Sequence, residues 1–234
     1  MVAAGNTLRP NLPLVFLGPS MNGIEARGLL TANYRPPVRR GDLPARFAGT
    51  VIIIDGDFHQ SLSVSPKEIL RLLDTGTTVV GAASMGALRA TELSTFGMIG
   101  LGWVFEAYRT GVIVADDEVA VAYDPDTLAS LTVPLVNIRK WLLDLATYGH
   151  IDVKTAKVLF KMAREIFYAD RVERRLLGAW TDKLGQGRLD ALLQASGGRL
   201  SNVKADDAKL DLVTCRVEQA AHAGDQAGGK VGND

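Results

Sequence analysis

The sequence predicts an α/β fold, with a parallel-sheet core in the N-terminal half and a helical C-terminal half packed on it. Two observations predict this fold. Three apolar runs in the first half each end in small or acidic residues, and a capped helix separates the second run from the third. After Pro134, apolar residues recur at helical spacing in VNIRKWLLDLATYG and VKTAKVLFKMAREIFYADRVERRLLGAW.

The composition divides the chain into a core and two ends. Residues 1–11 are expected to form a loose leader. Residues 12–219 are expected to form a single domain, with a site-bearing α/β part at 12–133 and a helical part at 134–219. Residues 220–234 are small, polar and glycine-rich, which predicts a disordered tail.

The three apolar runs predict parallel strands near 13–17, 50–55 and 77–82. The runs are LPLVFLGPS (12–20), TVIIIDGDF (50–58) and TTVVGAASMGA (77–87). Between the last two, SPKEILRLLDTG predicts a helix, because Ser65 and Glu68 form a capping box, Pro66 suits the first helical position and Gly76 ends the helix. Residues 50–82 therefore predict a right-handed βαβ unit.

The segments that follow these strands should meet at one edge of the sheet. Parallel strands end at the same edge, and a crossover helix begins there, so this edge collects residues from distant parts of the chain. The residues expected at this edge are Gly18, Ser20, Asp55, Lys67 and Ser84.

Ser84 resembles the nucleophile of a strand–turn–helix elbow. Small residues surround it, and the amides of Met85 and Gly86, at the start of the next helix, could receive an oxyanion. The alternative is that Ser84 only caps the helix, which is the commoner role of serine at a helix start.

A hydroxyl nucleophile needs a base, and Lys67 is the candidate. Its place at a helix N-terminus disfavours the charged ammonium, and a neutral lysine can take a proton from serine. The alternative is a solvated lysine at a helix start, which is the commoner outcome for a single lysine. Among the histidines, only His59 falls near this edge.

Composition excludes several classes of function. The 26 basic and 26 acidic residues cancel, so no charge excess indicates nucleic acid or an anionic membrane. The single cysteine, Cys215, excludes a disulfide framework, and no apolar run is long enough to span a bilayer, so a cytoplasmic protein is expected. Asp116, Asp117 and Glu118 flank a strand-like stretch, where alternating orientation makes them a poor metal cage, and no metal or organic cofactor is expected.

A series of short motifs resembles the TfuA family in order and spacing. The motifs are VFLGPS, YRPPVRRGDL, IIIDGDF, SVSPKEIL, VGAASMGALRATELSTFGM, DDEVAV and PLVNIR. The resemblance covers roughly residues 14–140, and VKADDA (203–208) is similar to a short C-terminal element of the family. Ser65 and Pro66 depart from the family pattern, which often has bulkier residues before the lysine.

The resemblance implies a function in peptide backbone thioamidation. TfuA-like proteins are partners of YcaO enzymes, which use ATP to activate a peptide amide for replacement of oxygen by sulfur. The family is understood to hydrolyse a thiocarboxylated ThiS-type sulfur-carrier protein through a Ser–Lys pair, and to help the YcaO enzyme bind its peptide. The resemblance places this pair on Ser84 and Lys67. It also implies that the small residues around Ser84 admit the thin C-terminal tail of the carrier protein. A non-catalytic adaptor of a YcaO enzyme remains the alternative.

Overall fold

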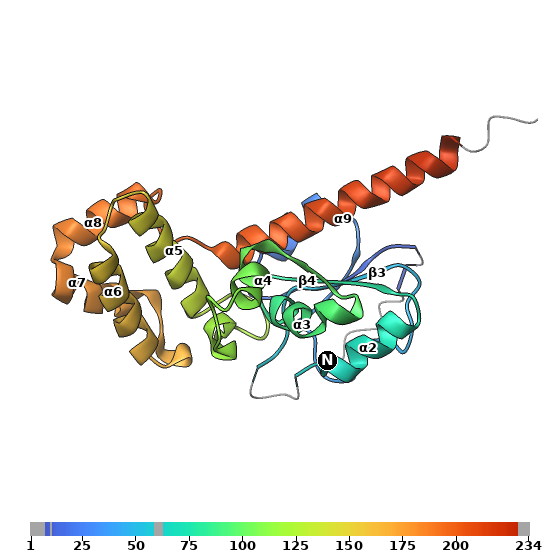
Figure 1. The fold of residues 1–234 in the computed structure, drawn as a ribbon, viewed down its shortest axis with the longest axis horizontal. Coiled ribbons are helices and arrows are strands. Elements are labelled where there is room, and N and C mark those ends of the chain that lie inside the picture. Colours follow the sequence, from blue (N-terminus) through green and yellow to red (C-terminus); the bar gives the residue numbers. More distant parts are fainter. Residues whose placement is uncertain (1–7, 10, 59–62, 229–234) are drawn as a thin grey trace, which may run out of the picture.

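The computed structural model describes residues 8, 9, 11–58 and 63–228, with side chains up to residue 218 (Figure 1). The strands are β1 (Leu14–Phe16), β2 (Asn33–Arg35), β3 (Thr50–Ile53), β4 (Thr78–Ala82) and β5 (Ile99–Leu101). The helices are α1 (Gly23–Leu29), α2 (Pro66–Asp74), α3 (Met85–Leu93), α4 (Gly102–Arg109), α5 (Leu135–Thr147), α6 (Val153–Glu165), α7 (Glu173–Leu184), α8 (Gln186–Ala195) and α9 (Val203–Gly228). Short 3₁₀ turns occur at η1 (Ser94–Phe96), η2 (Asp116–Val119) and η3 (Tyr168–Asp170).

All five strands of the sheet are parallel, in the order β2-β1-β3-β4-β5. The α/β fold and the three predicted strands are therefore confirmed, and the β3-α2-β4 segment is the expected βαβ unit. The predicted interaction between Ser65 and Glu68 is also present. The Ser65 amide and hydroxyl both donate to the Glu68 carboxylate, at 2.9 and 2.7 Å.

Helices cover both faces of the sheet, as continuous apolar strands require. Alternate residues of the strands point to opposite faces, so Phe16 and Ile53 pack in the cluster with α2, α3 and α4. Val15 and Ile52 pack in the other cluster, which contains residues of α1 and α9. Figure 1 shows this layering, with α9 on one side of β3 and β4 and α2 and α3 on the other.

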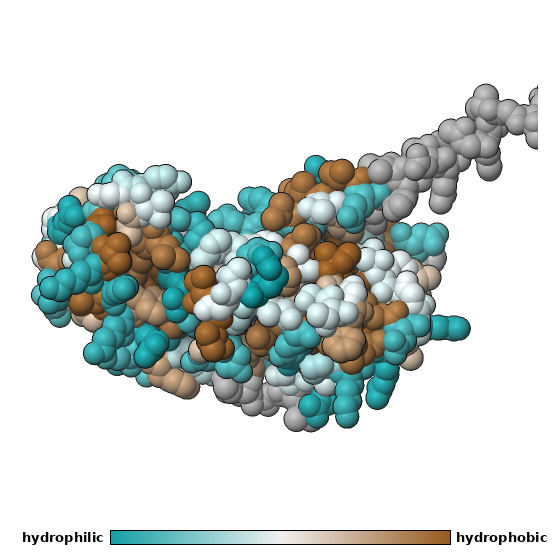
Figure 2. Space-filling model, viewed as in Figure 1, coloured by the Kyte–Doolittle hydropathy of each residue, from teal (hydrophilic) through white to brown (hydrophobic). Residues whose placement is uncertain are grey.

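The helices α5 to α8 form their own core beside the sheet. Trp141 and Trp180 are fully buried there, with ring centroids 5.4 Å apart and nearly parallel planes. The helical run predicted from residue 153 to residue 180 is broken between α6 and α7, where the buried guanidinium of Arg171 donates to Ala163 O and Ile166 O. Figure 2 shows apolar side chains gathered in separate groups over both this part and the α/β part.

Several predicted boundaries differ from the structure. The stretch around Asp116, expected to be strand-like, forms the 3₁₀ turn η2, because it runs between α4 and α5 with no strand beside it. α9 continues to Gly228, so the tail expected from residue 220 is helical up to that point, and residues 229–234 lie outside the described residues. Most of the expected leader, residues 1–7 and 10, also lies outside them. No helix in the described part of the chain is both long and apolar enough to cross a bilayer.

Two glycines allow α3 to pack directly on the sheet. A Cβ atom on Gly86 would lie 1.6 Å from Ile53 O, and one on Gly81 would lie 2.2 Å from Gly86 O. The backbone of α3 thus occupies the space that a side chain would need. This contact sets the position of the first turn of α3 at the sheet edge.

We predict that Gly86→Ala destabilises the protein by about 3 kcal/mol or more, because the methyl group overlaps backbone atoms that cannot move aside. Gly178→Ala is the matched control, since Gly178 lies within α7 with nothing within 4 Å of its added Cβ. That change should stabilise the protein by about 0.5–1 kcal/mol. Urea unfolding of both variants measures the difference, and equal effects would contradict the packing.

α9 buries a carboxylic acid against the sheet. Asp211 is 0% exposed, and neither of its oxygens has a hydrogen-bond partner among the described residues. Burial raises the pKa of Asp211 to about 8, with smaller contributions from Glu218 and Asp207. Its carboxyl group is therefore mainly protonated at neutral pH in the folded protein.

We predict that this burial makes the protein less stable as the pH rises from about 4 to about 8. In that range the folded state keeps a proton that the unfolded state loses, so the free energy of unfolding falls by up to about 1.4 kcal/mol per pH unit. Asp211→Asn should remove this slope and add about 2–4 kcal/mol at pH 7. Urea unfolding across this range measures both. Asp206→Asn, on the exposed side of α9, should leave the slope unchanged, and an unchanged slope in Asp211→Asn would refute the prediction.

Candidate active site

The strand order places a ligand-binding position at the carboxyl ends of β1 and β3. The chain moves from β1 to β2 on one side and then returns past β1 to β3 on the other, so the direction of the strand order reverses at β1. Open parallel sheets bind ligands outside the strand ends at such a topological switch point. The segments found there are the turn after β1 and the residues after β3.

Asp55 joins these two segments. Its buried carboxylate accepts hydrogen bonds from the amides of Gly18 and Ser20, at 2.9 and 3.0 Å, and from the Ser20 hydroxyl at 2.6 Å. Gly18 is required at this turn because a Cβ there would lie 2.4 Å from Pro37 Cγ. The structure therefore brings together three of the residues that the sequence placed at this edge.

Ser84 lies at the carboxyl end of β4, in a strained turn. The preceding residue, Ala83, has a φ of 63°, a left-handed conformation that costs an alanine about 1–2 kcal/mol. Ser84 is 3% exposed and occupies the N-cap position of α3, but its hydroxyl makes no capping hydrogen bond. Capping therefore does not account for this hydroxyl.

The two amides at the start of α3 differ in whether they already donate a hydrogen bond. The Gly86 amide donates to Ile54 O at 3.3 Å, so its expected role as an oxyanion donor is not supported; Gly86 serves the close packing of α3 instead. No acceptor is found for the Met85 amide within the described part of the chain. Met85 N therefore remains a donor candidate beside Ser84.

The space around Ser84 is already filled. The neighbouring Ala82 and Ala83 are fully buried and belong to the same apolar cluster as Ala208 and Leu212 of α9. These small residues leave no open space beside Ser84 in this structure, and the room expected for a substrate tail stays a prediction. They are small because the backbone of α3 and the side chains of α9 pack against this turn.

Lys67 lies in the first turn of α2, as predicted, but its side chain is exposed. The described residues offer it no hydrogen bond or ion pair, and the structure does not bring its ammonium into a hydrogen bond with Ser84. His59, the other residue considered near this edge, lies outside the described residues.

A different lysine occupies the edge of the sheet. Lys204, in the first turn of α9, is 2% exposed, and its Nζ donates to Val119 O at 2.9 Å. The same Nζ lies 3.9 Å from Asp55 Oδ1. Burial lowers the pKa of Lys204, and the Asp55 carboxylate partly opposes this shift.

Asp207, one turn further along α9, binds the start of α4. Its two carboxylate oxygens accept from the amides of Trp103 and Val104, at 2.8 and 2.7 Å, and Gly102 gives it room, since a Cβ there would lie 2.3 Å from the Asp207 carboxyl carbon. Burial raises the pKa of Asp207 to about 6, while the two amides oppose the shift. α9 thus contacts the residues that follow both β3 and β5.

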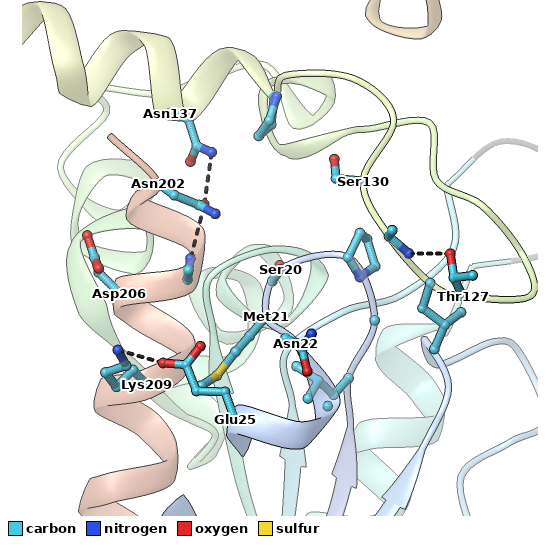
Figure 3. A pocket seen from close by; sticks show the side chains of 18 of the residues that line it. Ser20, Met21, Asn22, Glu25, Thr127, Ser130, Asn137, Asn202, Asp206 and Lys209 are labelled. Atoms are coloured by element: carbon cyan, nitrogen blue, oxygen red, sulfur yellow. Dashed lines mark hydrogen bonds and ion pairs between the residues drawn. The ribbon is translucent and has the colours of Figure 1, made fainter. Parts of the chain in front are cut away.

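An open cleft of about 1310 Å³ lies beside this edge, between the α/β part and α5. Figure 3 shows Glu25 on α1 paired with Lys209 on α9, at 2.8 Å, and Asn137 on α5 hydrogen-bonded to Asn202, at 3.0 Å. Ser20 lines the cleft and Ser84 does not. The candidate nucleophile is therefore covered, while Ser20, which donates to the buried Asp55, lies at the cleft wall.

The acidic residues near the edge are engaged by cations rather than grouped as metal ligands. Glu118 accepts from the Arg139 guanidinium at 2.7 Å, and Asp57 accepts from Arg39 at 2.6 Å and from the Tyr123 hydroxyl. In the ranges that the structure describes, no three histidine, cysteine, aspartate or glutamate side chains could hold one metal ion.

Sequence reasoning missed Lys204 and Asp207 as site residues. The segment VKADDA (203–208) was noted only because it resembles an element of the TfuA family. Asp207 is 104 residues from its partner Trp103, so their contact leaves no local pattern in the sequence. A lysine at a helix start is normally exposed, so nothing in the local pattern marks Lys204 as buried.

The model of a protein family described as TfuA-like protein matches residues 55–172, just over half of the chain. The matched segment contains Asp55, Lys67 and Ser84 but neither Ser20 nor Lys204. A comparison with curated proteins finds no match. The chain belongs to the TfuA-like family, and its role is therefore that of a partner protein of a YcaO enzyme.

Proposed function

We propose that this protein is a cytoplasmic hydrolase that cleaves a thiocarboxylated ThiS-type sulfur-carrier protein with Ser84 as nucleophile. The sulfide released would supply YcaO-dependent thioamidation of a peptide backbone. In the same role the protein assists the YcaO enzyme in binding its peptide. Membership of the TfuA-like family supports the partnership, and the geometry around Ser84 supports the chemistry.

The observation that carries the proposal is the unengaged hydroxyl of Ser84 in a strained elbow. The hydroxyl has no hydrogen-bond partner among the described residues, although the residue lies at a helix start where a cap would be expected. The strain at Ala83 fixes the turn that places this hydroxyl at the carboxyl edge of the sheet. Backbone strain of this kind clusters at functional sites.

The chemistry requires an acyl transfer to serine. Attack of Ser84 Oγ on the thiocarboxylate carbon gives a tetrahedral oxyanion next to the N-terminus of α3, whose positive end favours negative charge. As this intermediate collapses, the proton of the Ser84 hydroxyl passes to sulfur, the carbon–sulfur bond breaks to expel HS⁻, and an acyl ester remains on Ser84. Water then cleaves the ester and returns the carrier as a carboxylate.

The low exposure of Ser84 favours a second candidate, a non-catalytic adaptor. In that case Ser84 and its covering residues form part of the scaffold, and the cleft beside Ser20 binds a segment of a partner. The two candidates differ in whether the purified protein releases sulfide by itself.

We predict that Ser84→Ala lowers sulfide release from a thiocarboxylated carrier by at least about 10³-fold, because the nucleophile is lost. Folding and YcaO binding should remain, since the hydroxyl makes no hydrogen bond with the residues that the structure describes and its removal should cost less than about 1 kcal/mol. Sulfide release by the purified proteins measures the effect, with circular dichroism and co-purification of the YcaO enzyme as controls.

Ser94→Ala is the matched control, because Ser94 lies exposed at the other end of α3. It should release sulfide at the wild-type rate. Wild-type release by Ser84→Ala would end the assignment of the nucleophile, and a wild-type protein without any release would favour the adaptor.

A further inference from the structure

Charge is unevenly distributed along this neutral chain. The whole chain carries 26 basic and 26 acidic residues, but residues 135–195, which contain α5 to α8, carry 11 basic and 7 acidic residues, a net charge of +4. The rest of the chain therefore has a net charge of −4. The helical part has its own apolar core and contains neither Ser84 nor Lys67. Its excess of basic residues is therefore separate from the chemistry proposed for Ser84.

The basic residues of α6 lie in a row on one side of the helix. They occupy positions i, i+3, i+7 and i+10 and are all exposed: Lys154, Lys157, Lys161 and Arg164. At 3.6 residues per turn, these positions fall within a sector of about 80° and extend over about 15 Å along the helix axis. The other side of α6 is buried in the core of the helical part through Ala156, Leu159 and Ala163. The four basic residues, called the basic row below, therefore form the outer side of α6.

The basic row is largely unpaired. In the part of the chain that the structure describes, only Lys161 has an ion pair, with Glu165 at 3.9 Å, and both side chains are highly exposed. Exposed pairs of this kind contribute little. Other acidic residues nearby have partners elsewhere, since Asp152 caps α6 and Asp170 pairs with Arg175 at 3.4 Å. The positive charge of the row is thus free to interact with another molecule.

Large apolar side chains are exposed at both ends of the basic row. Tyr148, in the turn before α6, is 76% exposed. Val153, the first residue of α6, is 60% exposed, and Phe167, just after α6, is 63% exposed. Aromatic and arginine side chains are enriched where proteins bind one another. The basic row and these three residues, together called the α6 face, thus have the composition of a protein-binding surface.

Other polyanionic ligands fit the α6 face less well. A nucleic acid duplex is much longer than a row of about 15 Å, and it would also meet the net negative charge of the rest of the chain. An anionic membrane binds basic helices that present an apolar side as well, whereas the apolar side of α6 is buried in the core of the protein. The α6 face therefore fits an acidic surface of another protein.

The position of α6 separates this face from the candidate active site. α6 packs against α5 and α7, and α5 in turn contacts α9 and η2. Figure 1 shows α5 between α6 and the α/β part. A carrier protein has to reach the carboxyl edge of the sheet, so a partner bound at the α6 face would leave that edge to the carrier. Membership of the TfuA-like family supplies such a partner, the YcaO enzyme.

We propose that the α6 face is the surface with which this protein binds an acidic surface of the YcaO enzyme. The proposal rests on the YcaO partnership within the proposed function and does not depend on the hydrolase chemistry. The basic row accelerates and orients the encounter, because exposed complementary charges act mainly on the rate and specificity of association. The apolar side chains at its ends supply buried contact area.

The test measures the dissociation constant of the full-length protein for its purified YcaO enzyme at low and at high salt. Lys157→Glu/Lys161→Glu reverses the charge in the middle of the row, so it should weaken binding at low salt by at least about tenfold. It should also reduce the dependence of binding on salt, because fewer attractive charges remain to be screened.

Arg46→Glu/Arg71→Glu is the matched control. Both arginines are exposed on the α/β part, and neither has an ion pair with a described residue. The control changes the net charge of the protein by the same amount and should bind the YcaO enzyme as wild type does. Circular dichroism establishes that each variant is folded. If Lys157→Glu/Lys161→Glu does not fold, Lys157→Gln/Lys161→Gln replaces it, with a smaller loss of affinity expected.

The outcomes decide the proposal as follows. Wild-type affinity in the folded row variant would overturn it, and so would an equal loss in the control. Binding of duplex DNA, or of vesicles of phosphatidylcholine and phosphatidylserine, that the row variant loses while it keeps its affinity for the YcaO enzyme would assign the face to that ligand instead. A wild type that does not bind the YcaO enzyme would also overturn the proposal.

Sulfide release keeps this proposal distinct from the hydrolase. The isolated row variant should release sulfide from a thiocarboxylated carrier protein at the wild-type rate, because its substitutions lie on α6, beyond α5 from the sheet. If wild type releases no sulfide but the row variant loses YcaO binding, the hydrolase fails and the docking surface stands. If wild type releases sulfide and the row variant keeps YcaO binding, the docking surface fails and the hydrolase stands.

Discussion

The docking of the first turns of α9 on the carboxyl edge of the sheet is the contact on which the candidate site depends. The carboxylate of Asp207 binds the two free amides at the start of α4, which otherwise would lack acceptors in a buried position. Hydrogen bonds to a charged group contribute about 1.5–3 kcal/mol each, so this pair outweighs most other polar contacts of the fold. The position of Lys204, one turn earlier, follows directly from this anchor.

The helical layers on the two faces of the sheet make different contacts with the turn at Ser84. On the face of α2 and α3, glycine-mediated contact fixes the helix that begins after Ser84. On the face of α1 and α9, the same turn is covered by apolar side chains and bordered by buried ionisable groups. The hydroxyl is thus held rigidly from one side, and its electrostatic surroundings are set from the other.

Local features of the site could be predicted from the sequence because each depends on a few neighbouring residues. The capping box at Ser65 and Glu68 and the strand ending at Asp55 required only short windows of sequence. The strands β2 and β5 were not anticipated, because neither is a buried apolar run like the three-residue strand β1: Asn33–Arg35 is polar and only partly buried, and Ile99–Leu101 contains a central glycine and is partly exposed.

The packing role of the small residues around Ser84 and the burial of Lys204 could not be predicted from short windows of sequence. Gly86 has the same appearance in the sequence whether it faces an empty site or the oxygen of Ile53. Lys204 is buried only because Asp207 ties α9 to a segment about a hundred residues earlier. Such a long-range contact leaves no local pattern.

The order of the elements along the chain also affects how the protein is made. α9 is the last element to leave the ribosome, so the sheet and α4 are synthesised before Lys204 and Asp207 exist. During that interval the amides of Trp103 and Val104 lack the Asp207 carboxylate that they bind in the folded protein. The nascent chain therefore passes through a stage in which all five strands have been synthesised but the contacts of α9 with their carboxyl edge have not yet formed.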